Sequence, residues 1–480
     1  MKSRLKIFTD FAEGVLPHEA AFLQKENRIR DDEKEEILNK VCRNAERFFS
    51  SEEFDEDIDK RKYAYIKKWI TKKLERADVD AHLEYLSYIE KQILTDTITS
   101  AEEKELQEFI NIYDNTSFYF QKFYELVREY QDYLLVRFRY QDCELTEAFL
   151  RKNQKFYQKS LEVKDEIFHA TKDLTRQYTS QKINTKHWES MLLEYVHDDQ
   201  MDGRNKYHAF IRLVFLYFNY KEYEKARELF DYIDSCFKDG LMYSRRVLFN
   251  YYANRVILHS NLKDLDQAEY YAHLSVKQDN SDKLFYLNNL VAILLKKDKN
   301  KEALDLLTDN YKLFKNSFNH HQKLGFATHY VRTLVRNKRI SIAETFAKNF
   351  LYENRKHVFE HRWSRFFSNY LMLLTTAEKP AEVIGVTRKY NLLERESEEL
   401  KGRENQIPKI HWYYYLANYL NGQYSEDKLF RKLVDSIESV SSLDAEGFQA
   451  LDEFIDRLSF SLPRFFSNLK SHFSEKQLIS

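Results

Sequence analysis

Residues 210–217 read FIRLVFLY, and Tyr223, Ala226 and Phe230 follow them after a short break. The bulky apolar residues of the first segment recur at helical spacing, and Ala226 and Phe230 lie four apart, on one face of a second helix. Two short helices cross closely only where a small residue such as Ala226 faces a bulky one. The stretch therefore predicts a hairpin of two packed helices.

Weaker copies of this hairpin follow along the chain. The small residue at the crossing returns as Ala268, Ala303 and Ala343, at intervals of 42, 35 and 40 residues. Two further helices are expected to begin at Trp363 and Trp412. Such self-similarity is typical of stacked helical repeats, in which neighbouring hairpins share their bulky rows.

The order of residue types in these hairpins resembles the tetratricopeptide repeat. The resemblance covers residues 205–435, although the spacing is wider than the family period of about 34 residues and the repeat-closing proline is missing throughout. It implies an all-α fold of helical-hairpin repeats stacked as an α-solenoid. It also implies that the first helix of each hairpin lines a concave groove.

Glycine and proline are scarce, with 8 and 4 among 480 residues. Sheets joined by tight turns and phosphate-binding loops need residues that reach positive φ or fix φ, so the composition favours helices. No two glycines lie closer than 17 residues, which excludes glycine-rich nucleotide loops.

Four regions are expected along the chain. Residues 1–100 form an N-terminal helical region with an acidic run at 52–59 and a basic amphipathic helix at 60–76. Residues 101–200 form a long antiparallel helical hairpin that reverses near 142–144, with arms of about 30 residues, and that could also make a homodimer. The repeats occupy 205–435, and residues 436–480 form C-terminal capping helices.

The charge totals nearly cancel, with 76 Lys and Arg against 77 Asp and Glu. Any attraction to a charged partner must therefore be local. The three cysteines, Cys42, Cys143 and Cys236, lack metal spacing and are typical of a reducing compartment. No apolar run is long enough to span a membrane, so we expect a cytoplasmic protein.

The resemblance assigns residues to the concave groove when the hairpins are aligned on their marker alanines. On this basis we expect six groove residues to contact a bound peptide: Asn288, Lys296, Arg332, Arg336, His208 and Phe215. Arg332 and Arg336 are one turn apart on one helix, and arginine offers forked donors to carboxylate oxygens. We therefore expect a non-enzymatic scaffold that binds an acidic protein or peptide in the groove.

Two alternatives remain open. Residues 322–365 hold ten Lys or Arg against three acids, a local basic patch that could bind nucleic acid instead. The string His357, Glu360 and His361 has the form of an inverted zinc-peptidase motif and would make a zinc hydrolase. The cations around that string repel zinc, and the leading interpretation needs no catalytic residue, metal or cofactor.

Overall fold

The computed structural model is all-α. It describes residues 5–47, 51–180, 184–277, 281–360, 363–401, 406–438 and 443–477, which form 25 helices and no strand. The chain divides into two units, residues 1–278 and 279–480. This boundary falls inside the region predicted as one run of repeats.

The first unit begins with a bundle of four helices, which are α1 (Lys6–Glu13), α2 (Pro17–Lys25), α3 (Asp32–Glu46) and α4 (Lys60–Ala77). The basic amphipathic helix expected at 60–76 is α4, and its apolar residues Tyr63, Ile66 and Ile70 are buried in the bundle core. This core therefore uses the apolar face of the helix.

The rest of the first unit follows the bundle, with α5 (Val79–Leu94), α6 (Ser100–Ile112), α7 (Phe120–Val136), α8 (Tyr140–Ser180), α9 (Trp188–His197), α10 (Gly203–Asn219), α11 (Tyr223–Lys238), α12 (Arg245–Asn261) and α13 (Leu265–Ser275). The hairpins predicted around Ala226 and Ala268 are α10 with α11 and α12 with α13. Both alanines are fully buried at the crossings.

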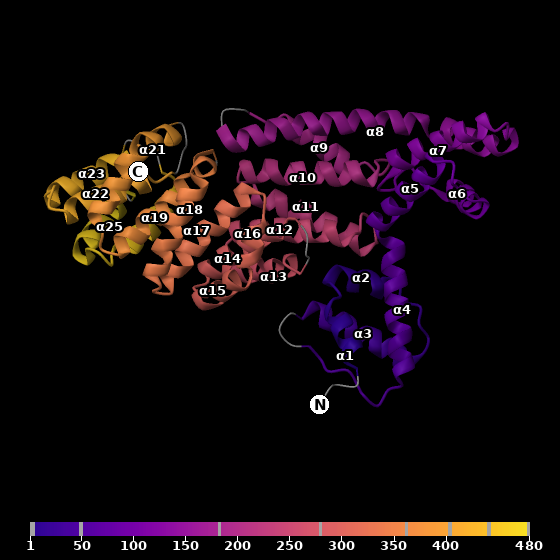
Figure 1. The fold of residues 1–480 in the computed structure, drawn as a ribbon, viewed down its shortest axis with the longest axis horizontal. Helices are drawn as coiled ribbons and strands as arrows, with labels where there is room; N and C mark the ends of the chain where they lie inside the picture. Colours follow the sequence, from indigo (N-terminus) through magenta and orange to yellow (C-terminus); the bar gives the residue numbers. More distant parts are fainter. Residues whose placement is uncertain are drawn as a thin grey trace. The chain divides into compact units, whose positions relative to one another are not determined.

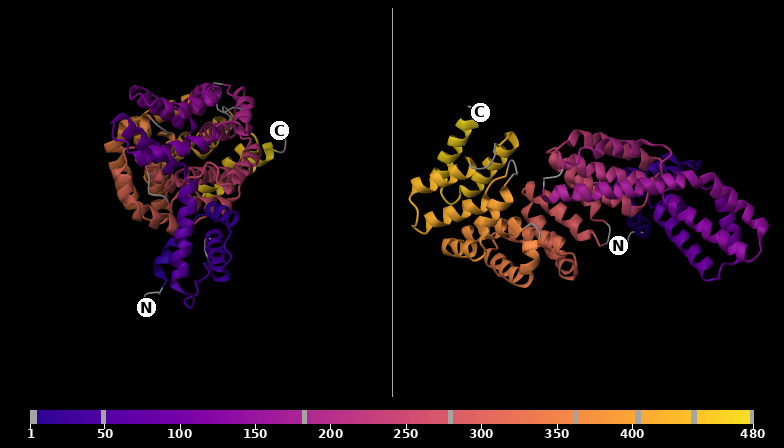
Figure 2. Two further views of the ribbon diagram at one scale, coloured as in Figure 1. Left: turned by 90° about the vertical axis from the view of Figure 1, so that its right-hand side faces the viewer. Right: turned by 90° about the horizontal axis from the view of Figure 1, so that it is seen from above.

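The long hairpin predicted at 101–200 is formed by α7 and α8, with unequal arms of 17 and 41 residues. It reverses at 137–139, ahead of the expected position, because Phe138 adopts a left-handed conformation with φ 58°. Asp142 instead lies in the first turn of α8, where a carboxylate complements the helix dipole. Since α8 is longer than α7, it also packs on α10 (Figures 1 and 2).

The second unit consists of α14 (Lys283–Lys296), α15 (Asn300–Asp309), α16 (Tyr311–Asn316), α17 (His320–Arg336), α18 (Ile340–Glu360), α19 (Trp363–Thr376), α20 (Pro380–Lys389), α21 (Leu392–Leu400), α22 (Lys409–Leu420), α23 (Glu426–Glu438), α24 (Ala445–Leu458) and α25 (Pro463–Gln477). Four helical hairpins begin with α14, α17, α19 and α22. The predicted caps are α24 and α25.

Six hairpin turns share one backbone conformation. In each turn, the second residue after the first helix is left-handed, with φ between 55° and 72°; these residues are Lys221, Lys263, Asp298, Lys338, Glu378 and Gly422. The amide that follows donates to a carbonyl five residues earlier at 2.8 to 3.0 Å, as in the Schellman motif. Five of the six positions lack glycine, so the repeated turn is a backbone feature that glycine content does not reveal.

Candidate functional site

The first helices of the four hairpins in the second unit pack side by side, in the order α14, α17, α19 and α22. Helix α24 approaches α22 through Phe454, whose ring lies 5.6 Å from Trp412 and 5.7 Å from Tyr413. The row formed by these helices carries cations from several turns. We call five cations of these helices and of α24, together with the neutral imidazole of His329, the basic face; its residues are Lys296, His329, Arg332, Arg365, Lys409 and Arg457.

Arg332 is the central residue of the basic face. It is half-buried, and no described residue accepts a hydrogen bond from its guanidinium or pairs with it. Burial and, to a smaller extent, the charges of Arg336 and Arg457 lower the pKa of Arg332 to about 10. Arg332 stays charged at neutral pH, but its charge is poorly compensated.

Lys409 of α22 is near three other cations of the basic face. Its Nζ lies 5.8 Å from the centre of the Phe454 ring. Burial lowers the pKa of Lys409, and the charges of Arg457, Arg365 and Arg332 add to this effect. Desolvation likewise lowers the pKa of Lys296. The charge of Arg332 also lowers it, whereas the charge of Glu453 raises it. Side chains from α14, α17, α19, α22 and α24 therefore act on one another electrostatically.

His329 and Tyr413 add neutral hydrogen-bond donors to this region. Burial lowers the pKa of His329 to about 3, with contributions from Arg332 and Arg365, so the imidazole is neutral at neutral pH. Its Nδ1 atom is buried and has no hydrogen-bond partner among the described residues. Burial raises the pKa of Tyr413, which keeps its hydroxyl protonated.

The acids nearest to the basic face have other partners. Glu396 accepts from the backbone amides of Ile410 at 3.0 Å and His411 at 2.9 Å, at the start of α22. Glu399 accepts from Ser364 at 3.1 Å. Glu453 lies 3.6 Å from Arg457. The described acids thus leave Arg332, Arg365 and Lys409 without an ion-pair partner.

Of the four groove residues predicted in this unit, Lys296 and Arg332 belong to the basic face, whereas the other two have structural contacts. Asn288 is buried, and its Nδ2 donates to the backbone oxygen of Gln322 at 3.0 Å, which joins α14 to α17. Arg336 donates to the backbone oxygen of Leu295 at 2.5 Å and lies 3.1 Å from Asp298. It therefore braces the turn after α14.

The other two predicted groove residues, His208 and Phe215, lie on α10 in the first unit, where α8 packs on that helix. Arg212, between them, donates from Nε to Thr171 Oγ1 on α8 at 2.8 Å. Burial lowers the pKa of His208 to about 4, and Arg212 and Arg204 add to this. Although Phe215 keeps 40% of its surface exposed, α8 occupies part of the α10 surface that the resemblance assigned to a groove.

The basic patch at 322–365 is not one surface of uncompensated charge. Lys348 lies 2.7 Å from Glu344 and 3.1 Å from Glu382. The Arg355 guanidinium lies 5.3 Å from the ring centre of Tyr390. These cations of α18 have partners of their own, whereas Arg332 and Arg365 belong to the basic face.

The zinc motif is described only in part, because His361 lies outside the described residues. His357 Nδ1 and Glu360 Oε2 are 3.0 Å apart, and Lys356 lies 3.7 Å from the same carboxylate. The His320 and His357 rings stack with centres 3.5 Å apart. Glu360 is therefore engaged with neighbours on its own helix.

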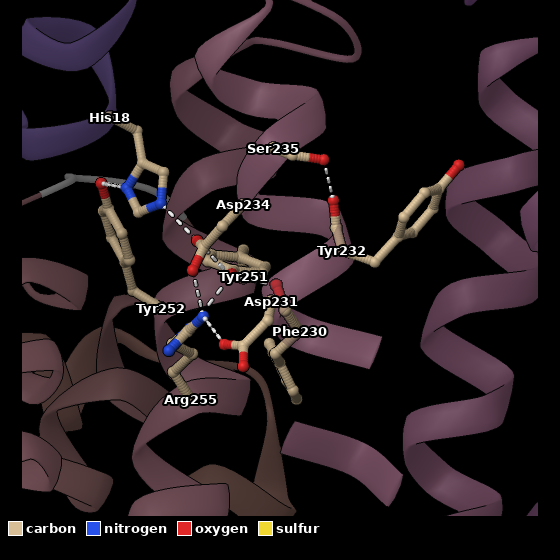
Figure 3. Close-up of polar contacts among 9 residues, drawn as sticks. All are labelled: His18, Phe230, Asp231, Tyr232, Asp234, Ser235, Tyr251, Tyr252 and Arg255. Atoms are coloured by element: carbon tan, nitrogen blue, oxygen red, sulfur yellow. Dashed lines mark hydrogen bonds and ion pairs between the residues drawn. The ribbon is translucent and has the colours of Figure 1, made fainter. Parts of the chain in front are cut away.

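A half-buried His–Asp arrangement in the first unit was missed from the sequence (Figure 3). His18 Nε2 lies 2.6 Å from Asp234 Oδ1, and His18 Nδ1 lies 2.9 Å from the Tyr252 hydroxyl. Burial alone would raise the pKa of Asp234, but the hydrogen bond from His18 and the charge of Arg255 lower it. Because Tyr252 is fully buried, we interpret this network as a joint between α2 and helices α11 and α12.

A second buried contact supports that interpretation. Glu19, beside His18 on α2, is fully buried and accepts from the Tyr243 hydroxyl at 2.6 Å and from Arg245 Nε at 2.8 Å. Both networks join residues more than 200 positions apart in sequence, so hairpin spacing could not have revealed them.

Arg365 and Lys409 occupy equivalent positions when the turns of the structure, instead of the alanines, are aligned. Each lies thirteen residues before the left-handed residue of its own turn, Glu378 or Gly422. The marker alanine is the fourth residue of the second helix, as Ala226 is in α11. In α20 and α23 this position is Val383 and Leu429, so the alanine alignment does not include these two hairpins. Both residues are fully buried there, as the alanines are.

No helix among the described residues is both long and apolar enough to cross a membrane. No family model matches this chain, and no curated protein or solved structure matches it.

Proposed function

We propose that this chain is a non-enzymatic scaffold with tetratricopeptide-like repeats, and that it binds an acidic segment of a partner protein on the basic face. The observation that carries the proposal is the set of half-buried or clustered cations on successive first helices, among which Arg332, Arg365 and Lys409 lack a described acidic partner. The buried alanines at the helix crossings and the repeated turns support the repeat class.

Electrostatics favours an anionic ligand at this face. Like charges that crowd together in a partly desolvated place repel one another, and a bound carboxylate relieves that repulsion. Arg332 and Arg365 provide forked donors for oxygen pairs, and Lys409 provides a point charge. Tyr413 and neutral His329 can donate hydrogen bonds without adding charge. An acidic peptide supplies several carboxylates along one segment, which suits cations spread over several helices.

The test uses the full chain and a fluorescein-labelled oligoglutamate peptide, with binding followed by fluorescence anisotropy. Charge reversal by Arg332→Glu with Lys409→Glu should weaken binding by about 100-fold, because it replaces two attractions by two repulsions. Affinity of the unmodified chain should fall as salt rises.

The matched control is Lys348→Glu with Lys356→Glu, which makes the same charge change on α18. This control should change affinity by no more than about threefold. Equal losses in the two double variants, or an unmodified chain that does not bind the peptide, would refute the assignment of the basic face.

Nucleic-acid binding by residues 322–365 is the competing function. Single-stranded RNA in the same assay distinguishes the two through the double variants, because salt weakens the binding of either ligand. Tight RNA binding that survives the Arg332 and Lys409 reversal but is lost in the α18 control would replace our proposal.

A further inference from the structure

A cleft lies in the same unit as the basic face, between α16, α17 and α18. Its volume is about 840 Å³. This value falls within the range of about 300–1,000 Å³ that is usual for sites of small organic ligands. None of its lining residues belongs to the basic face, so the cleft needs a separate explanation.

One side of the cleft is aromatic. Tyr311 and Phe314 of α16 face Phe346 of α18, with ring centres 6.3 and 6.0 Å apart, and Tyr330 of α17 lies 4.9 Å from Phe346. The rings meet edge to face or tilted, and several are only partly buried. Such faces offer stacking surface to a flat ligand.

Polar side chains of α18 also line the cleft: Ser341, Thr345 and Asn349 are exposed there. Ile342, next to Ser341, also lines the cleft and keeps half of its surface exposed. The cleft thus combines rings with hydrogen-bonding groups, as in sites that orient a ligand by a few polar contacts.

Two lysines at the cleft carry positive charge without a described acidic partner. Lys315 Nζ lies 5.3 Å from the ring centre of Tyr311, and Lys323 Nζ lies 5.5 Å from that of Phe314. Lys323 also donates to the backbone oxygen of Lys315 at 3.4 Å, which places the two lysines together. The acid lining the cleft, Glu353, forms no ion pair with either.

We propose that this cleft binds a small flat aromatic molecule that carries an anionic group. The rings of Tyr311, Phe314 and Phe346 contact the aromatic part, and Lys315 and Lys323 attract the anion. Because each lysine lies beside a ring that lines the cleft, one ligand can contact the rings and place its anionic group near a lysine. The ligand class follows from this pairing, and it differs from the peptide class proposed for the basic face.

The experiment uses the full chain with 2-naphthoate as the anionic probe and 2-naphthalenemethanol as its neutral counterpart, measured by isothermal titration calorimetry. The unmodified chain should bind one naphthoate. Lys315→Gln with Lys323→Gln should weaken naphthoate by about tenfold and leave the neutral compound nearly unchanged. Thr345→Trp, which fills the cleft from an exposed position, should abolish binding of both compounds.

Lys312→Gln is the matched control, because Lys312 is an exposed lysine of α16 that does not line the cleft. It should bind naphthoate like the unmodified chain. The Arg332 and Lys409 double variant should also bind it normally, which separates this site from the basic face. Absence of saturable naphthoate binding, or binding that Thr345→Trp leaves intact, would overturn the proposal; circular dichroism confirms that each variant is folded.

Discussion

The same helical position has different surroundings in the two units. Arg212 of α10 and His329 of α17 each lie nine residues before the left-handed residue of their turns, Lys221 and Lys338. In the first unit α8 packs on α10, and Arg212 bonds to Thr171. In the second unit His329 lies near the cations Arg332 and Arg365. The same position on a first helix thus contacts another helix in the first unit and belongs to the basic face in the second unit.

The largest expected effect concerns the α8 contact. Leu174 of α8 is buried, so Leu174→Ala should lower the free energy of unfolding of the first unit by ~3 kcal/mol. Affinity of the basic face for oligoglutamate should not change. Phe168→Ala, on the same helix but 57% exposed, is the control and should cost less than ~1 kcal/mol. Chemical denaturation measures both; equal costs would contradict a packing role for the buried face of α8.

A smaller effect is expected from pH in the second unit. Because the folded pKa of His329 is about 3, below its ordinary value of 6.5, the unfolded chain binds more protons between these values. Stability should therefore fall as pH decreases from 6.5 towards 3, by on the order of 2 kcal/mol from this residue. The substitution His329→Asn should flatten this pH dependence in urea unfolding curves. An unchanged pH profile would show that His329 is not desolvated.

The smallest effect concerns the turns that both units share. Lys338 is exposed and left-handed, so Lys338→Gly should raise the free energy of unfolding by ~0.5–1 kcal/mol through relief of backbone strain. Lys338→Ala removes the same side chain without relieving the strain and should not stabilise. Gly422→Ala should do the reverse and cost ~1 kcal/mol, because the backbone is left-handed there, with φ 72°. Nothing lies near the added methyl group, so this cost comes from the backbone alone. Thermal unfolding compares the three variants.

The sequence predicts the fold class and the hairpins better than it predicts the site. Two helices can cross closely only where a side chain is small, so a buried alanine marks a crossing. Four hairpins are located correctly in this way, by Ala226, Ala268, Ala303 and Ala343. The left-handed turn tolerates Lys, Asp and Glu, so it leaves little trace in residue types. The helix expected to begin at Trp363 is α19, and the helix expected to begin at Trp412 is α22, which begins at Lys409. No groove residue was assigned to these two hairpins, so Arg365 and Lys409 were missed.

Two of the predicted groove residues, Asn288 and Arg336, have contacts with neighbouring hairpins that the sequence does not reveal. Asn288 is buried, and its Nδ2 donates to the backbone oxygen of Gln322 on α17. One position along a helix turns a side chain by about 100°, so neighbouring positions on α14 have different surroundings. Arg336 donates to oxygens at the end of α14, which belongs to another hairpin; the acceptors are the backbone oxygen of Leu295 and the carboxylate of Asp298. These contacts depend on where neighbouring helices end, which spacing within one hairpin does not specify.

The joint at α2 also has a consequence for synthesis. His18 and Asp234 are separated by 216 positions, so the N-terminal bundle leaves the ribosome long before α11 and α12 exist. At about 5–20 residues per second, the bundle waits on the order of 10–40 s for its docking surface. During that interval it must remain folded on its own core, which the apolar cluster from Leu5 to Ile70 provides. The buried charges of Glu19 and Asp234 therefore meet their partners late, when the second half of the joint emerges.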